Sequence, residues 1–361
     1  MKAFRWRCWI FSTLVLLAAN TVRAWDYEGH RAVNQLALAA LPADFPAFVH
    51  EPANAERIAF LSGEPDRWRN VPDLPIKHYN GMDHYCDLEQ LADAGLDATR
   101  VPSLRYEFIL AFAAGRAAHP AMFPAEEPAK NLDHSREWPG FAPWAITEYY
   151  GKLKATFSYL KAYEEAGAPG EIAEARANVV YLMGIMGHYV ADCAQPLHTT
   201  KHHNGWVGPN PNGYTTWSGI HSWIDGGLAA KAGLAAEGLA RNLAPRLAPR
   251  PVLSVAARAD GRDPVFVAVM DYLLAQNRLV EPLYQLEKAG RLSNAQEKND
   301  RSRRFPGPVD AAGRALIEGQ LLKGGEMLSA IWATAWKQAA PEVYLRAQLL
   351  KRQTAAAKTT P

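Results

Sequence analysis

The sequence has few cysteines, no long apolar run beyond its first 24 residues, and no excess of charge of either sign. Only 3 of its 361 residues are cysteine, which excludes a small scaffold held together by disulfides. Beyond residue 24, no stretch approaches the roughly 20 apolar residues that a membrane-spanning helix needs. The 39 Lys and Arg residues nearly balance the 37 Asp and Glu residues, so bulk electrostatics cannot hold nucleic acid, and any polyanionic substrate must be bound locally. With 48% hydrophobic residues the chain can form a large core, which excludes a disordered protein.

The first 24 residues have the pattern of a secretory signal peptide. Three basic residues within the first seven positions precede a short apolar run at residues 9–19, and residues 22–24 (Val-Arg-Ala) match a small-x-small cleavage site. The apolar run is too short to span a membrane. We therefore expect cleavage after residue 24 and a secreted or periplasmic protein without stable membrane insertion. Cys86 and Cys193 remain after cleavage, and the sequence leaves open whether they form a disulfide.

Apolar residues recur mostly at helical spacing, and alternating runs of β-branched residues are nearly absent. This pattern predicts an all-α fold, with a single mostly helical domain over residues 25–350 and a disordered tail at 351–361. Helices are expected at about residues 29–40, 104–114, 145–166, 170–194, 264–288 and 308–339. Proline, glycine and asparagine are dense between them and predict long loops at residues 51–99, 120–143 and 199–218. Loops of that length tend to carry function.

The strongest chemical signal is a set of histidines and aspartates. His188 and Asp192 lie four residues apart on a predicted helix, so their side chains share one face. A proline should end this helix, and His198 follows in the next turn. A second pair, His221 and Asp225, repeats the spacing. One such pair occurs often by chance, but two pairs together with His198 predict a metal site, because imidazole and carboxylate are the ligands that zinc takes where cysteine is absent.

In their spacing, these five residues resemble the zinc-dependent single-strand-specific nucleases, whose superfamily includes zinc-dependent phospholipase C. The resemblance extends to Trp25 and His30. In that family an N-terminal Trp binds zinc through its free α-amino group and its carbonyl oxygen, together with a His five residues on. The predicted signal cleavage falls immediately before Trp25, so two independent patterns agree on the mature N-terminus. The specific motifs cover about residues 25–228, and the C-terminal third matches only in helical character.

The family has two further ligands, which fall between residues 61 and 89 here. An Asp followed three residues later by a basic side chain matches Asp66 and Arg69. A His followed by an aromatic residue, any residue and an Asp matches His84, because Asp87 has the required position. His78 is the competing match, but no acidic residue follows it at that spacing.

The resemblance implies three zinc ions within an all-α domain whose long loops surround them. The first ion would be held by Asp66, His84, His188 and Asp192, the second by His198, His221 and Asp225, and the third by Trp25 and His30 with Asp192 as a bridge. Two zinc ions that share a water lower its pKa toward neutrality, and the resulting hydroxide would attack a phosphodiester. Asp66 would also orient that water, and Arg69 would contact the phosphate with its forked donors.

Substrate choice is predicted to depend on Tyr85 and Asp87. In the nuclease branch, residues at these positions help to form a base-binding pocket. Stacking on Tyr85 would require an unpaired base, which favours single-stranded DNA or RNA as the substrate. In the other interpretation, Tyr85 packs in the core and Asp87 is hydrogen-bonded to a ligand histidine.

The loop at residues 203–214 departs from the nuclease pattern, which usually has a Gly-Gly-Asn element there. Its Trp206 and Tyr214 would border the active site and could bind bases, a lipid head group or another phosphoester. A phospholipase C that hydrolyses phospholipid head groups is therefore the alternative to the expected endonuclease. A non-catalytic zinc-binding protein is a more distant alternative, because structural zinc sites normally have four protein ligands and the second site has three. No obligate protein partner is evident from the sequence.

Overall fold

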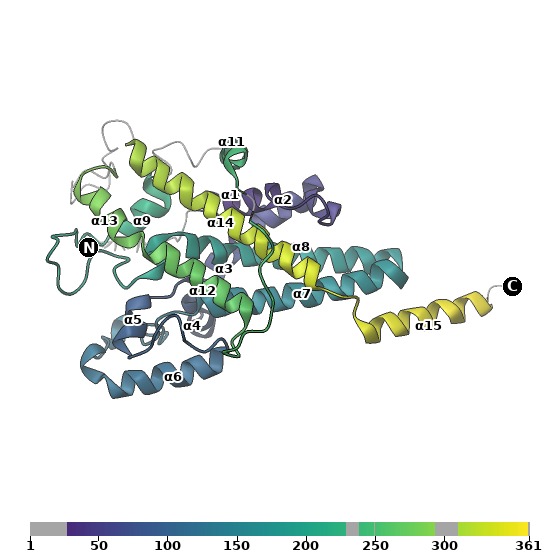
Figure 1. Cartoon of the computed structure of the whole chain (residues 1–361), viewed down its shortest axis with the longest axis horizontal. Helices are drawn as coiled ribbons and strands as arrows, with labels where there is room; N and C mark the ends of the chain where they lie inside the picture. Colours follow the sequence, from purple (N-terminus) through teal and green to yellow (C-terminus); the bar gives the residue numbers. More distant parts are fainter. Residues whose placement is uncertain (1–26, 229–237, 249, 293–309, 360–361) are drawn as a thin grey trace, which may run out of the picture.

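The computed structural model describes residues 27–228, 238–248, 250–292 and 310–359, and within these ranges it contains helices and no strands (Figure 1). The predicted all-α fold is confirmed. The predicted signal peptide and Trp25 lie outside the described residues. Among the helices that the structure describes, none combines the length and the apolar character needed to cross a bilayer.

Two long helices form the centre of the fold. A two-residue turn joins α7 (Ala142–Ala166) to α8 (Pro169–Ala194), and the two helices pack side by side (Figure 1). α1 (Tyr27–Ala39) and α14 (Ala311–Gln338) pack against each other and against α8, while α12 (Pro264–Asn277) packs against α7. Their facing apolar side chains belong to one continuous core.

A glycine lets α1 and α8 cross closely enough to bring two histidines together. A Cβ at Gly187 of α8 would lie 1.7 Å from Oδ1 of Asn34 on α1, so no side chain fits at this position. His30 precedes Asn34 by about one helical turn, and His188 directly follows Gly187. The imidazoles of His30 and His188 therefore stack, with ring centroids 4.0 Å apart.

The stretch at residues 51–99, which we expected to be a long loop, is largely helical. It contains α2 (Pro52–Leu61), α3 (Glu64–Asn70), α4 (Leu74–Gly81), the 3-10 turn η2 (Met82–His84) and α5 (Leu88–Asp93). The prediction was wrong because such short helices show no clear apolar repeat. In addition, the prolines of α2, α3 and α4 lie in the first helical turn, where a missing N–H costs nothing.

The remaining elements follow the predicted pattern more closely. The expected loops at residues 120–143 and 199–218 are confirmed apart from short 3-10 turns and the start of α7. The helix expected at 264–288 is divided into α12 and α13. The bounds not yet given are η1 (Ala47–His50), α6 (Arg105–Ala118), η3 (Pro120–Met122), η4 (Pro128–Lys130), η5 (Pro196–Thr199), α9 (Ile220–Ser222), η6 (Trp223–Gly227), α11 (Leu239–Leu243), η7 (Ala244–Arg246) and α13 (Val280–Lys288).

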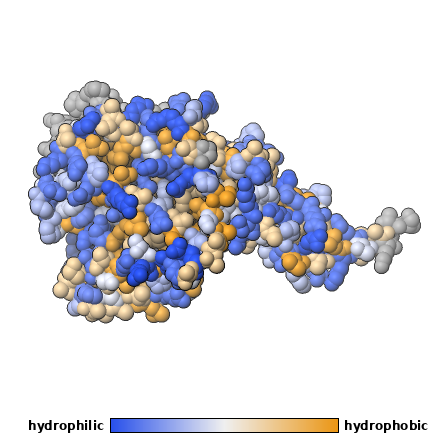
Figure 2. Space-filling model, in the orientation of Figure 1, coloured by the Kyte–Doolittle hydropathy of each residue, from blue (hydrophilic) through white to orange (hydrophobic). Residues whose placement is uncertain are grey.

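The C-terminal segment that we expected to be a disordered tail is helical as far as the structure describes it. α15 (Val343–Thr359) extends away from the main body, as Figures 1 and 2 show. Its composition of Ala, Leu, Gln, Lys and Arg favours a helix. Two ion pairs, Arg346–Glu165 and Arg352–Glu171, join it to the end of α7 and the start of α8. The tail prediction missed these long-range contacts, which sequence spacing does not reveal.

The two cysteines left after the predicted cleavage do not form a disulfide. Cys86 and Cys193 are both buried and both have free thiols. The pairing that the sequence left open is therefore absent from the structure, and burial rather than a covalent bond is what the two side chains contribute to the core.

Candidate metal centre

Histidine and aspartate side chains from separate elements meet in three clusters, whose members are all buried except Asp66. The His30 cluster contains His30, His188 and Asp192; the Asp66 cluster contains Asp66, His84 and His188; and the Asp225 cluster contains His198, His221 and Asp225. Within each cluster the candidate ligand atoms lie within 4.8 Å of one another. Every predicted ligand in the described residues takes part, and the remaining one, Trp25, lies outside them.

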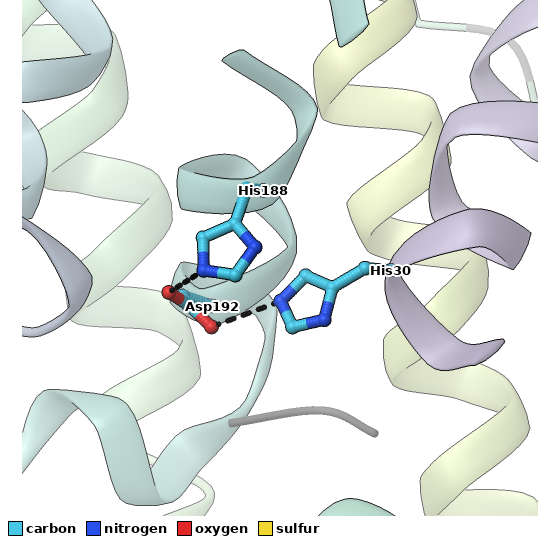
Figure 3. A group of neighbouring side chains, drawn as sticks. All are labelled: His30, His188 and Asp192. Atoms are coloured by element: carbon cyan, nitrogen blue, oxygen red, sulfur yellow. Dashed lines mark hydrogen bonds and ion pairs between the residues drawn. The ribbon is translucent and has the colours of Figure 1, made fainter. Parts of the chain in front are cut away.

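Asp192 lies where the His30 and Asp66 clusters meet. Its Oδ1 is 3.2 Å from Nε2 of His30, and its Oδ2 is 3.2 Å from Nε2 of His188 and 3.0 Å from Nδ1 of His84. Figure 3 shows the carboxylate between the imidazoles of His30 and His188, with one oxygen turned toward each. With its two oxygens facing different clusters, this carboxylate can bridge two cations.

In the Asp66 cluster, two imidazoles and a carboxylate converge from η2, α8 and α3. Nε2 of His188 lies 2.8 Å from Nδ1 of His84, and each of these nitrogens is 3.9 Å from Oδ1 of Asp66. Both imidazoles are fully buried, whereas the Asp66 side chain is 17% exposed, so the cluster opens toward solvent on the Asp66 side. The competing candidate His78 is exposed, and its Nδ1 lies 2.6 Å from the carbonyl oxygen of Asp133.

The Asp225 cluster brings η5 against the segment formed by α9 and the π-helical turn η6. Nε2 of His221 lies 2.9 Å from Nε2 of His198 and 3.1 Å from Oδ2 of Asp225. All three side chains are nearly excluded from solvent. π-helical turns are rare and occur often at functional sites, and here the turn carries Asp225.

Backbone carbonyl groups fix which imidazole nitrogen faces each cluster. Nδ1 of His188 lies 2.7 Å from the carbonyl oxygen of Ser62, and Nδ1 of His198 lies 2.9 Å from the carbonyl oxygen of His84. A carbonyl oxygen can only accept, so in both neutral histidines Nδ1 carries the hydrogen. The Nε2 lone pairs are thereby directed into the clusters, as metal-binding histidines require.

An unpaired carboxylate oxygen of the Asp225 cluster fits a cation. Oδ2 of Asp225 is buried and faces Nε2 of His221, and it has no hydrogen-bond partner in the described residues. Leaving a buried polar group unpaired costs about 1–3 kcal/mol. Two imidazole nitrogens 2.9 Å apart, such as those of His198 and His221, also repel each other unless a proton or a cation lies between their lone pairs. The clusters can therefore hold metal ions.

Burial and neighbouring charges hold His84, His221 and Asp192 in the protonation states that bind metal. Burial lowers the pKa of His84 to about 3, with a further contribution from Arg69. Burial and His198 likewise hold the pKa of His221 well below its ordinary value. Burial opposes the ionisation of Asp192, but His188 and His198 outweigh it and hold the pKa of this carboxyl well below its usual range. His84 and His221 are thus held neutral near the ionised Asp192, as metal ligands must be. For His188, burial is outweighed by the charges of Asp192 and Asp66, which raise its pKa, so a cation would displace its proton.

Asp225 differs from Asp192 in its electrostatics. Burial raises the pKa of the Asp225 carboxyl well above its ordinary value, although a hydrogen bond from Gln195 opposes this. A buried carboxylate with few compensating charges is costly unless a cation neutralises it. This is a second reason, besides geometry, why the Asp225 cluster suits a cation.

Arg69 lies at the open side of the Asp66 cluster. Its Nη2 is 3.0 Å from Oδ1 of Asp66, three residues earlier on the short helix α3, and its side chain is 21% exposed. The guanidinium also contributes to the electrostatics of His84, His198 and His221. A guanidinium group at the solvent side of buried ligands can donate paired hydrogen bonds to an anionic substrate.

The structure does not test the predicted base-binding roles of Tyr85 and Asp87. Asp87 is 3% exposed and accepts a hydrogen bond of 3.1 Å from Nε2 of Gln90. Tyr85 is half-buried, and its backbone packs so closely under Gly140 that a Cβ there would lie 2.1 Å from the Tyr85 carbonyl oxygen. No histidine is among the hydrogen-bond partners that the structure gives Asp87, and base binding stays a prediction.

The loop at residues 203–214 is held by aromatic contacts within itself, to His202 and to α13. Trp206 stacks on His202 with ring centroids 3.9 Å apart, and it also contacts Tyr214 and Tyr284. Tyr214 is only 5% exposed. Tyr214 therefore supports the loop from within, whereas the half-buried Trp206 keeps part of its surface at the outside.

Sequence reasoning missed the residues that hold the ligands in place. Gln195 donates from Nε2 to Oδ1 of Asp225 over 2.7 Å, and Ser62 orients His188 through its carbonyl group. Gln195 lies between Asp192 and His198 in the sequence, which is the one signal that could have indicated it. A backbone carbonyl carries no such signal, since every residue has one.

Comparisons with known proteins assign no family. No protein-family model matches the chain, and neither a curated protein nor a solved structure matches it. The three clusters are therefore the basis on which a function can be argued.

Proposed function

We propose that this chain is a zinc-dependent hydrolase of phosphodiester bonds, and specifically an endonuclease that cleaves single-stranded DNA or RNA. The observation that carries the proposal is that residues far apart in the sequence, from His30 to Asp225, converge in three adjoining clusters. These are the residues that the resemblance to the single-strand-specific nucleases assigns to zinc.

The donor set supports zinc as the metal. It consists of imidazole nitrogens and carboxylate oxygens without thiolate, since both described cysteines are outside the clusters. The Asp225 cluster offers three protein ligands, which matches a catalytic zinc site with one position open to water or substrate. This count favours catalysis over mere storage of zinc.

The proposed chemistry divides between zinc and the protein. Bound zinc ions would supply Lewis acidity, an ionised water near neutral pH and neutralisation of the charge that develops on the phosphoryl group. Asp66, partly exposed beside the buried imidazoles, would accept a hydrogen bond from the attacking water and orient it. Arg69 would donate two hydrogen bonds to the phosphate and position it against that water.

Phospholipase C activity remains the second candidate because one surface feature favours it. The loop at residues 203–214 lacks the nuclease element, and Val207 at its outer side is 47% exposed. An exposed apolar side chain in this loop suits a lipid better than a polyanion. The spacing of Trp25 to His30 and of His198 to His221 supports the nuclease branch instead.

The experiment that tests the proposal compares two substrates. Correctly processed, zinc-loaded protein is given single-stranded DNA and, in parallel, phosphatidylcholine vesicles, each with and without a chelator. Chelator-sensitive cleavage of DNA is the expected result. Cleavage of the lipid alone would overturn the nuclease assignment and retain the metal site, and cleavage of neither substrate would contradict the proposed function.

A matched pair of histidine variants shows whether the clusters cause the activity. His84→Ala should remove activity together with zinc, because His84 lies in the Asp66 cluster and contacts Asp192. His78→Ala changes an exposed histidine of the neighbouring helix α4 and should leave both unchanged. Equal losses in the two variants, measured by DNA cleavage and metal content, would contradict this assignment.

Arg69→Ala is expected to lower kcat/KM for single-stranded DNA about 10- to 100-fold, because hydrogen bonds to a charged group contribute about 1.5–3 kcal/mol. The zinc content should be unchanged, since Arg69 is not a ligand. Steady-state kinetics and metal analysis of the same preparation check both points. The control is Arg67→Ala, which alters a surface arginine of the same helix that pairs with Glu64. Loss of zinc in Arg69→Ala would show that Arg69 acts through Asp66 instead of the substrate.

A further inference from the structure

Gln195 is a fully buried amide between two metal clusters, and both ends of its side chain are used. Its Oε1 accepts a hydrogen bond of 2.6 Å from the backbone N–H of Leu197, and its Nε2 donates one of 2.7 Å to Oδ1 of Asp225. A backbone N–H can only donate, so the orientation of the amide is fixed and the NH₂ group must face Asp225. The side chain is 0% exposed, and Asp225 is 1% exposed.

The two ends of Gln195 join separate parts of the centre. Leu197 directly precedes His198 in η5, whereas Asp225 lies in the π-helical turn η6, on the far side of the loop at residues 203–214. Gln195 therefore connects the segment that carries His198 to the segment that carries Asp225. Both segments contribute ligands to the Asp225 cluster.

The hydrogen bond also selects one oxygen of Asp225 for the cluster. Because Nε2 of Gln195 occupies Oδ1, Oδ2 is left to face His221, 3.1 Å away. Oδ2 has no hydrogen-bond partner in the described residues. An amide donor stabilises the carboxylate without adding charge, so the full negative charge of Asp225 remains for a cation.

From this geometry we propose that Gln195 is a positioning residue that sets the affinity of the Asp225 cluster for its metal ion. It holds Asp225 in a single orientation and fixes the distance between Asp225 and His198. This inference rests on the metal binding in the proposed function and deepens it. The His30 and Asp66 clusters have no contact with the Gln195 side chain among the interactions described, so they should keep their ions when it is changed.

Gln320 provides a matched control. It is a second buried glutamine, 3% exposed, whose Nε2 donates to the carbonyl oxygen of Ala194 and to Oε1 of Gln276. Gln320 thus supports the same region of the chain, at the end of α8, without touching a candidate ligand. Replacement of either glutamine by leucine removes one buried amide from this region, so both variants are expected to lose stability.

The experiment titrates zinc-loaded wild-type, Gln195→Leu and Gln320→Leu proteins with a chelator and counts the ions that remain per chain by mass spectrometry. We expect Gln195→Leu to release one ion at a free zinc concentration about 10- to 100-fold higher than the wild type does, the usual effect of losing a partner of a metal ligand. Gln320→Leu should release its ions as the wild type does. Unchanged release in Gln195→Leu, or the same loss in Gln320→Leu, would overturn the proposal.

A second variant separates positioning from folding. Gln195→Glu keeps an oxygen that accepts from the Leu197 N–H but places a carboxylate oxygen against Oδ1 of Asp225. This variant should lower the affinity of the Asp225 cluster for its ion. In cobalt-substituted protein it should alter the visible absorption of the cobalt ion in this cluster and leave that of the other ions unchanged. An unchanged cobalt spectrum in a folded Gln195→Glu protein would overturn the proposal. If the wild type binds its ions and does not cleave nucleic acid, the proposed function fails while this inference stands.

Discussion

Replacement of Asp192 by asparagine is expected to lower hydrolysis of single-stranded DNA by about a thousandfold, which corresponds to about 4 kcal/mol of transition-state stabilisation. Asp192 contacts His30, His84 and His188 through its two oxygens, so two clusters depend on it. Asparagine has nearly the same size but lacks the charge, and its NH₂ group cannot ligate a metal ion. Zinc content should fall together with activity, and both are measured on one preparation.

Asp83→Asn is the control for this change. Asp83 is also a buried aspartate, and it directly precedes His84, but its Oδ1 pairs with Nη1 of Arg105 at 2.7 Å instead of facing the clusters. The Asp83→Asn protein should keep its zinc. If the Asp192→Asn protein retains more than about a tenth of the wild-type activity, the central position assigned to Asp192 is wrong.

Acidification of zinc-free protein is expected to cause the largest change in stability. Burial and Arg69 lower the pKa of His84 to about 3, whereas the same group has a pKa of 6.5 in the unfolded chain. Between these two values the unfolded chain binds a proton that the folded chain does not, so the free energy of unfolding falls as the pH falls. The contribution of His84 to the free energy of unfolding is fully present above about pH 6.5 and is lost progressively toward pH 3.

The expected slope of the free energy of unfolding against pH is about 1.4 kcal/mol per pH unit for one such histidine. His221, whose pKa is also held well below its ordinary value by burial and His198, steepens it further. Urea unfolding of zinc-free protein at several pH values between 7 and 4 measures the effect. Zinc-loaded protein serves as the control, because bound metal keeps these imidazoles unprotonated until it is released. A stability of the zinc-free protein that does not change between pH 6.5 and 4 would contradict the burial of neutral histidines.

Part of the centre could be predicted from sequence because it follows helical periodicity. His188 and Asp192 lie on one face of α8, and a proline opens η5 directly after that helix, so that His198 returns toward the same face. The choice of His84 over His78 also agrees with the structure, which places only His84 in a cluster. In these cases, local geometry determines the direction of the side chain.

Other parts depend on contacts that sequence spacing does not encode. The carbonyl groups of Ser62 and His84 orient two imidazoles, and neither could be identified from residue type. The short helices between residues 51 and 99 were missed because tertiary packing stabilises them more than an apolar repeat does. The C-terminal helix was missed for a similar reason, since its ion pairs to Glu165 and Glu171 link residues about 180 positions apart.

The measurement that tests the central claim most directly is the number of zinc ions per chain in correctly processed protein. The protein is loaded with zinc and dialysed to remove weakly bound metal. Mass spectrometry then gives the zinc concentration, and the absorbance of the same sample gives the protein concentration. The proposed arrangement, in which His188 binds the ion of the Asp66 cluster and Trp25 completes the His30 cluster, predicts close to three zinc ions per chain, falling to about one or none in Asp192→Asn. A folded wild-type protein that retains less than one zinc ion per chain would contradict the account.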